Sequence, residues 1–242
     1  MGERVKLMNG RFLFVGLLCA IFYSNAAFAV EMKAGFSEGD SVPNFTLKTV
    51  NGDVVDMKYA ALDNYVGKSP KTPKKALLLS FFATYCDPCK KEMPFLSAVV
   101  KEYREKGLEA LLVSIDKEEA DIKIAKDLAA EHGVDFPVLA DRYNIVAKRY
   151  GVSNLPCVYL INAGSKVDWV SVGYDKESPA KLLAAVRQAI GEPLTDPVPE
   201  SIQAYLEHEE PKKKDKVKKK KKKKKKKKAK KGKKKAKSKK NG

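Results

Sequence analysis

The chain has 242 residues and a formal net charge of +18, but this charge is unevenly distributed. Residues 211–242 hold 23 lysines against one acid and carry +22, residues 1–29 carry +2, and residues 30–210 therefore carry −6. The acidic body excludes a basic nucleic-acid-binding fold as the core, and the 44% of hydrophobic residues excludes a wholly disordered chain.

The first 29 residues have the order of a secretory signal peptide. Basic residues precede the apolar run 12–23, and the small-residue motif Ala27-Phe28-Ala29 follows it. We expect cleavage after Ala29 and export to the periplasm; the alternative is an uncleaved N-terminal segment that anchors the protein in the membrane. Cleavage would remove Cys19 and leave three cysteines in an oxidising compartment.

Residues 30–191 alternate between strand and helix patterns, which predicts an α/β domain with a central mixed β-sheet flanked by helices. Residues 39–47, followed by Asn51-Gly52, predict a strand and a turn, and hence an N-terminal β-hairpin. The apolar run 76–83 is typical of a strand buried on both faces. Further strands are expected at 110–115, 136–140, 158–161 and 167–172, and helices at 88–106, 118–131, 144–150 and 178–190.

The C-terminal part has three segments of different composition. Residues 192–199 contain three prolines and predict a linker, and residues 201–210 could form one short helix. The lysine tail, residues 211–242, cannot bury apolar surface and repels itself, so we expect it to be disordered.

The motif Cys86-Asp87-Pro88-Cys89 lies where the buried strand gives way to the first long helix. A thiolate at a helix N-terminus faces unpaired backbone N–H groups, which lowers its pKa, and two such cysteines can form and release a disulfide by exchange. We expect Cys86 to be the more exposed attacking thiol and Cys89 the shielded thiol that resolves the mixed disulfide. A structural disulfide is one alternative, and a metal site is another.

A metal site would need two ligands besides the cysteine pair. The body offers Cys157, His132 and His208 without a paired spacing, so we expect no bound metal and no cofactor.

The segment Phe81–Pro94 resembles the F-W-A-T-W-C-x-P-C-K-x-E-x-P signature of thioredoxin-like proteins of the TlpA/ResA type, within the redoxin family. The similarity extends from Gly39 to Gly191 and includes Gly151–Pro156, which matches the family's G-V-x-x-x-P phrase. The resemblance implies a thioredoxin-like fold whose inserted helix is 118–131, and an exported thiol–disulfide oxidoreductase. It also implies that Pro156 is a cis-proline that packs against the disulfide.

Four positions near the motif carry further expectations from this resemblance. Phe82 and Tyr85 replace tryptophans of the family, and because both keep an apolar ring we expect the site surface to survive. Ser80 stands where thioredoxins carry a buried aspartate, so that proton relay is absent. Glu92 matches a glutamate of the family and could accept a proton from Cys89; alternatively it only favours the helix dipole.

Cys157 directly follows Pro156, and the sequence leaves its role open. It is either a buried small apolar residue or a third thiol that exchanges with Cys89. The alternation of apolar and polar residues around it is too weak to show which way its side chain points.

The resemblance implies an enzyme that reduces disulfides of other proteins, for instance apocytochromes c, with electrons from a membrane thiol donor. One alternative is a copper chaperone of thioredoxin-like fold, which would need a wider cysteine spacing and a well-placed histidine. Another is a binding protein that acts through the lysine tail on an anionic surface such as lipid headgroups or lipopolysaccharide. Nucleic acid is an unlikely partner because export removes its usual supply.

Overall fold

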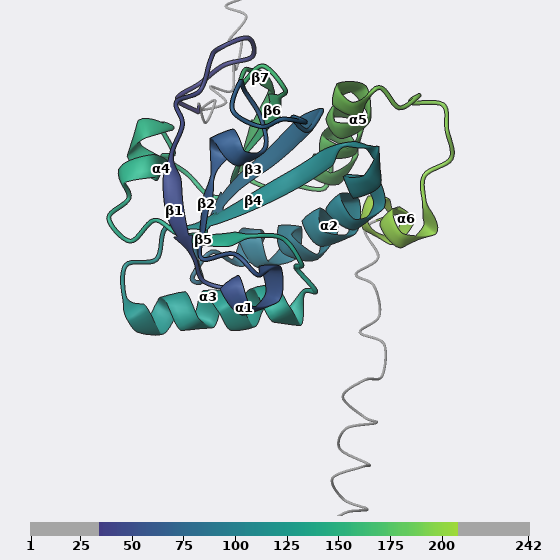
Figure 1. Cartoon of the computed structure of the whole chain (residues 1–242). Helices are drawn as coiled ribbons and strands as arrows, with labels where there is room; N and C mark the ends of the chain where they lie inside the picture. The colour runs from purple at the N-terminus through teal and green to yellow at the C-terminus, as the bar shows by residue number, and fades with distance from the viewer. Residues whose placement is uncertain (1–33, 208–242) are drawn as a thin grey trace, which may run out of the picture. The chain divides into compact units, whose positions relative to one another are not determined.

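A seven-stranded mixed sheet organises residues 34–207, the part of the chain that the computed structural model describes (Figure 1). The expected signal peptide and lysine tail lie outside these residues. The strand order is β2-β1-β5-β4-β3-β6-β7, in which β3 pairs in parallel with β4 and antiparallel with β6. The strands are β1 (Thr46–Thr49), β2 (Tyr59–Ala61), β3 (Ala76–Phe82), β4 (Leu108–Ser114), β5 (Val138–Ala140), β6 (Cys157–Asn162) and β7 (Val167–Val172).

Helices cover both faces of the sheet. On one face lie α2, α3, α5 and α6, whose apolar side chains form one core cluster with alternate residues of β3, β4 and β6. On the other face, α4 and the segment around β1 and β2 form a second cluster with the remaining strand residues. The helices are α1 (Gly52–Val55), α2 (Asp87–Tyr103), α3 (Glu119–Glu131), α4 (Ile145–Arg149), α5 (Ser178–Ile190) and α6 (Glu200–Leu206).

The central strand β3 is buried along its whole length, as its apolar sequence predicts. Leu78 and Phe82 pack against α2, whereas Leu77, Leu79 and Phe81 belong to the cluster on the other face. The expected mixed sheet, its flanking helices and the inserted helix α3 between β4 and β5 are therefore confirmed.

The N-terminal hairpin is present in a different form from the one expected. β1 pairs antiparallel with β2, but Asn51-Gly52 is not a two-residue turn, because α1 lies between the strands. The side chain of Asn51 donates to the carbonyl of Phe136 (3.0 Å) and accepts from the N–H of Val138 (2.9 Å). Asn51 thus joins the end of β1 to β5, which a local turn rule does not anticipate.

The N-terminal strand begins later than expected, whereas the last helix begins where the sequence predicts. The strand expected from residue 39 begins at Thr46, because the backbone of residues 39–42 instead bonds to Ser165 and Val167 beside β7. The last helix spans Ser178–Ile190, as expected, and the carboxylate of Asp175 accepts from the N–H groups of Glu177 and Ser178 at 2.9 Å just before it.

The segment after α5 folds back onto the domain. The buried guanidinium of Arg187 donates to the hydroxyl of Tyr103 (2.9 Å) and to the carbonyls of Asp196 (2.9 Å) and Pro197 (3.0 Å). These bonds hold the proline-rich stretch that leads to α6. The helix α6 buries Ile202 in the cluster formed with α2. Residue 207 is therefore held beside the domain rather than released at Gly191.

None of the helices within residues 34–207 has the length and apolar character needed to cross a membrane.

Candidate active site

The cysteine pair lies at the edge of the sheet where β3 ends and α2 begins. The parallel strands β3, β4 and β5 all end at this edge, so the segments that follow them converge there. A turn closed by the N–H of Cys86 and the carbonyl of Ala83 (3.1 Å) connects β3 to α2. This turn presents Cys86 at the cap position of α2, as the sequence predicts.

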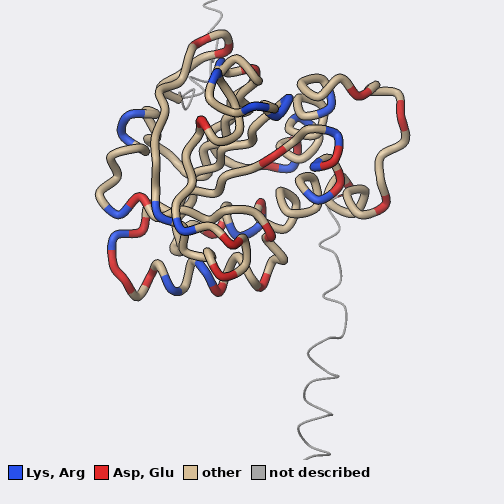
Figure 2. Tube along the Cα trace, viewed as in Figure 1, with Lys and Arg blue, Asp and Glu red and all other residues tan. Residues whose placement is uncertain are grey.

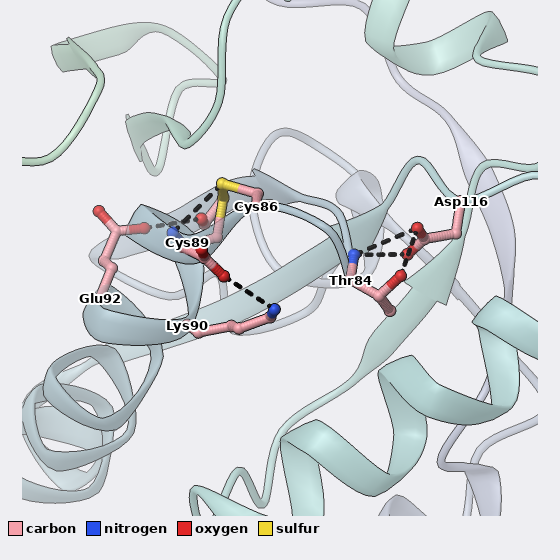
Figure 3. Close-up of a disulfide and its surroundings, with 8 residues drawn as sticks. Thr84, Cys86, Cys89, Lys90, Glu92 and Asp116 are labelled. Atoms are coloured by element: carbon pink, nitrogen blue, oxygen red, sulfur yellow. Dashed lines mark hydrogen bonds and ion pairs between the residues drawn. A yellow bond between two sulfur atoms is a disulfide. The ribbon is translucent and has the colours of Figure 1, made fainter.

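Cys86 and Cys89 form a disulfide with a Cα–Cα distance of 5.3 Å (Figure 3). The sulfur of Cys86 accepts the backbone N–H of Cys89 at 3.2 Å, so it lies against an otherwise unpaired donor of the first turn of α2. Cys86 is 7% exposed and Cys89 2% exposed. The order of exposure agrees with an attacking first thiol and a shielded second one.

A groove of about 520 Å³ opens beside Cys86. It is lined by the turn around Cys86, by Ile115 after β4 and by residues 152–155 of the loop before β6. Cys89 is not among its lining residues, so a molecule in the groove meets Cys86 first. The peptide bond between Leu155 and Pro156 is cis, as the family resemblance implies.

The two aromatic residues expected to form the site surface have different positions. Tyr85 is 73% exposed and lines the groove, so its ring is part of the site surface. The expectation is wrong for Phe82, which is buried in the core against α2. The sequence does not separate Phe82 from Tyr85, because β3 is buried on both faces and its continuous apolar run does not show which residue is the last to lie in the core.

Glu92 lies one turn after Cys89 and is 4% exposed (Figure 3). The hydroxyl of Ser80 donates to its carboxyl group over a long 3.4 Å bond. Burial raises the pKa of Glu92 to about 8, and the Ser80 bond offsets part of this effect. The group thus titrates near neutral pH, the range in which a proton acceptor for a thiol is useful.

Cys157 belongs to the apolar cluster on the opposite face of the sheet from the disulfide. It alternates along β6 with Val158, which packs on the α2 side, and it shares its face with Tyr159. Burial raises the pKa of the Cys157 thiol to about 12, so it is a thiol rather than a thiolate at neutral pH. This placement supports the buried apolar residue and disfavours exchange with Cys89.

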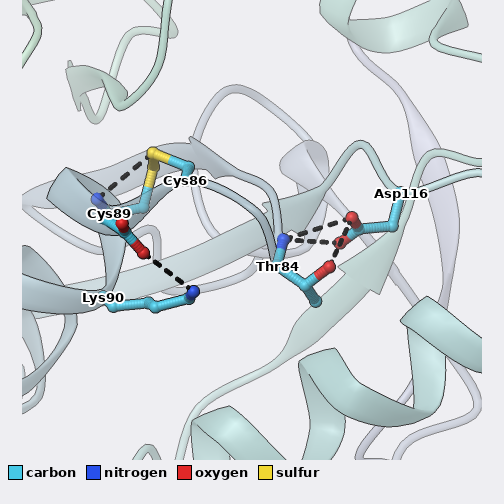
Figure 4. A network of polar contacts seen from close by, with 6 residues as sticks. Thr84, Cys86, Cys89, Lys90 and Asp116 are labelled. Atoms are coloured by element: carbon cyan, nitrogen blue, oxygen red, sulfur yellow. Dashed lines mark hydrogen bonds and ion pairs between the residues drawn. A yellow bond between two sulfur atoms is a disulfide. The ribbon is translucent and has the colours of Figure 1, made fainter.

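A network around Asp116 was not anticipated from the sequence (Figure 4). Asp116 follows β4 and is 3% exposed. Its carboxylate accepts the backbone N–H of Thr84 at 3.1 Å and the Thr84 hydroxyl at 2.9 Å. The hydroxyl of Ser114 adds a third donor at 2.7 Å. The sequence does contain a signal for this network: Asp116 comes directly after the buried strand predicted at 110–115, next to the strand that leads to the cysteine pair.

Within residues 34–207, no group of three or more His, Cys, Asp or Glu side chains is arranged to hold a metal ion.

Comparisons with known proteins show the family to which the chain belongs. The model of the AhpC/TSA family matches residues 39–170. The chain is 36% identical over 165 residues to the thiol-disulfide oxidoreductase ResA of Bacillus subtilis, covering 67% of this chain and 82% of that protein. It is 31% identical over 176 residues to ResA of Oceanobacillus iheyensis, covering 71% and 86% of the two chains.

A solved structure supports the fold. A putative thiol:disulfide interchange protein DsbE from Chlorobium tepidum superposes with a TM-score of 0.55 at 24% identity, covering 64% of this chain and 99% of that one. The expected thioredoxin-like architecture is therefore confirmed.

The raised pKa of Glu92 predicts a specific pH dependence of stability. A carboxyl whose pKa is about 8 when folded and about 4.5 when unfolded binds its proton more tightly in the folded state. Its contribution is therefore fully present below pH 4.5 and is lost as the pH rises through 8. The free energy of unfolding of the parent should therefore fall between pH 4.5 and pH 9 by roughly 4 kcal/mol more than that of Glu92→Gln, which has no carboxyl group at this position.

Urea unfolding of the oxidised protein at pH 4.5 and pH 9 measures this difference. Glu105→Gln is the matched control, because Glu105 is exposed on the turn that follows α2, and it should decline like the parent. An equal decline in the parent and Glu92→Gln would contradict the buried, raised carboxyl.

Proposed function

Because the chain belongs to the AhpC/TSA family and is a thiol–disulfide oxidoreductase of the ResA type, we propose that it is an exported reductant of disulfides in other proteins. The observation that carries this proposal is the Cys86–Cys89 pair at the start of α2, with the sulfur of Cys86 against the N–H of Cys89. A groove beside Cys86 gives room for the segment of a substrate that bears the disulfide.

The reaction is a two-step thiol–disulfide exchange. The thiolate of Cys86 attacks one sulfur of the substrate disulfide, forms a mixed disulfide and releases the other substrate sulfur as a thiolate, which takes up a proton. Cys89, after losing its proton, attacks the sulfur of Cys86 and releases the second substrate thiol. Two electrons and two protons reach the substrate, and the enzyme is left with the Cys86–Cys89 disulfide. A dithiol donor then reduces this disulfide by the reverse exchange.

We assign Glu92 as the acceptor of the Cys89 proton. It lies one turn after Cys89 in α2, is buried beside Ser80, and has a pKa of about 8 because of burial. A group that titrates near the working pH can take the proton from Cys89 and return it in the reverse step. Pro156, at the cis peptide before β6, is assigned to shape the wall of the groove that faces Cys86.

The direction of electron flow is proposed to be reductive. Asp87 lies next to Cys86, and its charge disfavours a neighbouring thiolate; since a reductant is a dithiol that gives up its electrons readily, this favours reduction of the substrate. An ion pair of Asp87 with Lys90 at 3.0 Å offsets part of this effect. Apocytochromes c are the proposed class of substrate, and a membrane protein with reactive thiols is the proposed electron donor.

The proposed location is the periplasm. Residues 1–29 are assigned as a signal peptide cleaved after Ala29, on the basis of their basic, apolar and small-residue order; retention of this segment as an anchor is the alternative. Residues 30–191 are assigned as the catalytic domain, residues 192–210 as a linker with a short helix, and residues 211–242 as the lysine tail.

The lysine tail is proposed to bind an anionic surface, either lipid headgroups or lipopolysaccharide. It carries +22, whereas basic and acidic side chains are interspersed along the described domain (Figure 2). Each lysine near an anionic membrane contributes about 1 kcal/mol, so the tail can bind without a folded structure.

Replacing each active-site cysteine should give a different product. Cys86→Ser should abolish reduction of insulin disulfides, because the attacking thiol is lost. Cys89→Ser should accumulate a mixed disulfide through Cys86, because the resolving thiol is lost. Non-reducing electrophoresis and peptide mass spectrometry detect the trapped species. Continued turnover of Cys89→Ser, or trapping through Cys157, would contradict the assigned roles; Cys157→Ala is the control and should behave like the parent.

Glu92→Gln should slow exchange near neutral pH and alter its pH profile. The amide cannot accept the proton of Cys89, so the rise in rate near pH 8 should disappear. Stopped-flow measurement of the reduction of a small disulfide between pH 6 and 9 records this change. Glu105→Gln serves again as the control, and a profile of Glu92→Gln identical to that of the parent would contradict the role as proton acceptor.

Deleting Pro211–Gly242 should abolish binding to anionic vesicles and leave the reduction of a small neutral disulfide nearly unchanged. The deletion begins after α6, so it leaves the described domain intact. Binding by lysines is Coulombic, so the full-length protein should co-sediment with phosphatidylglycerol vesicles at low salt and be released once the Debye length falls to about 8 Å. Neutral phosphatidylcholine vesicles are the control. Binding that survives the deletion would place the surface site on the domain instead.

A further inference from the structure

The turn before Cys86 is fixed from outside α2 by a carboxylate of the neighbouring strand. Ala83, Thr84, Tyr85 and Cys86 form this turn, and the N–H of Cys86 closes it onto the carbonyl of Ala83 at 3.1 Å. The N–H of Thr84, at the centre of the turn, points to both oxygens of Asp116 at 3.1 Å. The turn that carries Cys86 thus has a contact with the segment after β4 as well as its connection to α2 (Figure 4).

Asp116 is itself held rigidly. It is 3% exposed and accepts the hydroxyls of Thr84 (2.9 Å) and Ser114 (2.7 Å), while its own N–H donates to the Ser114 hydroxyl (3.2 Å). The next residue back, Ile115, donates its N–H to the carbonyl of Phe82 at the end of β3 (3.0 Å). The segment after β4 is therefore bonded to the chain just before the turn, at Phe82, and inside the turn, at Thr84.

We propose that Asp116 is a positioning residue for the oxidoreductase reaction: its carboxylate holds the Thr84 turn so that the sulfur of Cys86 stays against the N–H of Cys89. The proposal rests on the proposed roles of the two cysteines and adds a residue on a different strand. Asp116 does not line the groove, and its oxygens are occupied by the three donors, so it acts through the turn rather than on the substrate.

The chemical identity of Asp116 matters because a carboxylate only accepts hydrogen bonds. All its partners are donors: one backbone N–H and two hydroxyls. An asparagine of the same shape keeps one acceptor oxygen and turns an NH₂ group toward these donors, and an alanine keeps none. Asp116→Asn should therefore loosen the turn in part and Asp116→Ala fully.

The position of Cys86 can be followed through its titration, because contact with the helix N-terminus favours the thiolate. The other titratable groups on the surrounding segments are Tyr85 in the turn, Asp87, Cys89, Lys90, Lys91 and Glu92 at the start of α2, and Lys117 after Asp116; the loop 152–155 contributes none. None of these groups is changed by a substitution at residue 116, so a shift in the Cys86 titration reports on Asp116.

The test measures iodoacetamide alkylation of Cys86 against pH in the reduced full-length protein, with peptide mass spectrometry to separate Cys86 from the other thiols. Loss of the turn moves the sulfur of Cys86 away from the Cys89 N–H and so disfavours the thiolate. The midpoint of the curve of alkylation rate against pH should therefore rise by about one pH unit in Asp116→Ala. At pH values below both midpoints, this shift corresponds to a tenfold lower rate than in the parent. Asp116→Asn should give a smaller rise, and Thr84→Val, which loses the hydroxyl but keeps the N–H, should also rise.

The direction of the shift in the Cys86 midpoint distinguishes positioning by Asp116 from a purely electrostatic or a purely structural role. If Asp116 acted only through its negative charge, removing it would favour the thiolate and lower the midpoint, which would overturn the proposal. If Asp116 were merely structural, urea unfolding would show lower stability with an unchanged midpoint in Asp116→Asn and Thr84→Val, and this too would overturn it. Should Asp116→Ala fail to fold, these two milder variants decide the question.

Asp141 supplies a matched control. It is 2% exposed, follows the neighbouring strand β5 and accepts the N–H groups of Ile145 (2.9 Å) and Ala147 (2.8 Å) at the start of α4. Asp141→Asn should lower stability and leave the Cys86 midpoint at the parental value. A shift equal to that of Asp116→Asn would mean that any buried carboxylate at this edge affects Cys86, and the specific role of Asp116 would be wrong. Failure of the cysteine roles themselves would appear separately, as continued turnover of Cys89→Ser.

Discussion

The contact between the backbone N–H of Cys89 and the sulfur of Cys86 is the interaction on which the rest of the site depends. The first turn of a helix has N–H groups without partners inside the helix, and here one of them meets the sulfur that lies beside the groove. The same geometry stabilises a thiolate when the pair is reduced. In the proposed mechanism, one backbone feature, the start of α2, therefore both presents the attacking thiol and activates it.

This feature is kept in place by the two neighbours of β3. On one side, β4 is followed by Ile115, which lines the groove, and by Asp116, which accepts the bonds from Thr84. On the other side, β6 begins after the cis peptide between Leu155 and Pro156, and residues 152–155 before this peptide line the groove. Because β3 pairs with both strands along most of its length, a shift in either register would move one wall relative to Cys86. The buried sheet thus sets the spacing of the segments that line the groove.

The sequence predicts those parts of this arrangement that depend on neighbouring residues. The buried strand β3, the helix α2 and the cysteine pair between them follow from an apolar run, a helical pattern and a spacing. Three features could not be predicted, because each depends on contacts far along the chain. Asn51 bonds to residues 85 and 87 positions later in the chain, and Asp116 bonds to a residue 32 positions earlier. The helix α6 packs on α2, which lies about a hundred residues before it. The face on which Cys157 lies depends on where β6 starts in the register with β3.

The two buried acids near the disulfide, Glu92 and Asp116, differ in how many donors they meet, and this difference separates their roles. Glu92 has one long bond from Ser80 and little other compensation for burial, which is why its pKa rises to about 8 and its proton can move near neutral pH. Asp116 meets a backbone N–H and two hydroxyls at 2.7–3.1 Å, a set of donors that suits a fixed acceptor. These surroundings support the proposed roles, in which Glu92 exchanges a proton and Asp116 holds a turn. Glu92 lies in α2 and Asp116 follows β4, so the proposed proton acceptor and the proposed positioning residue come from different segments of the chain.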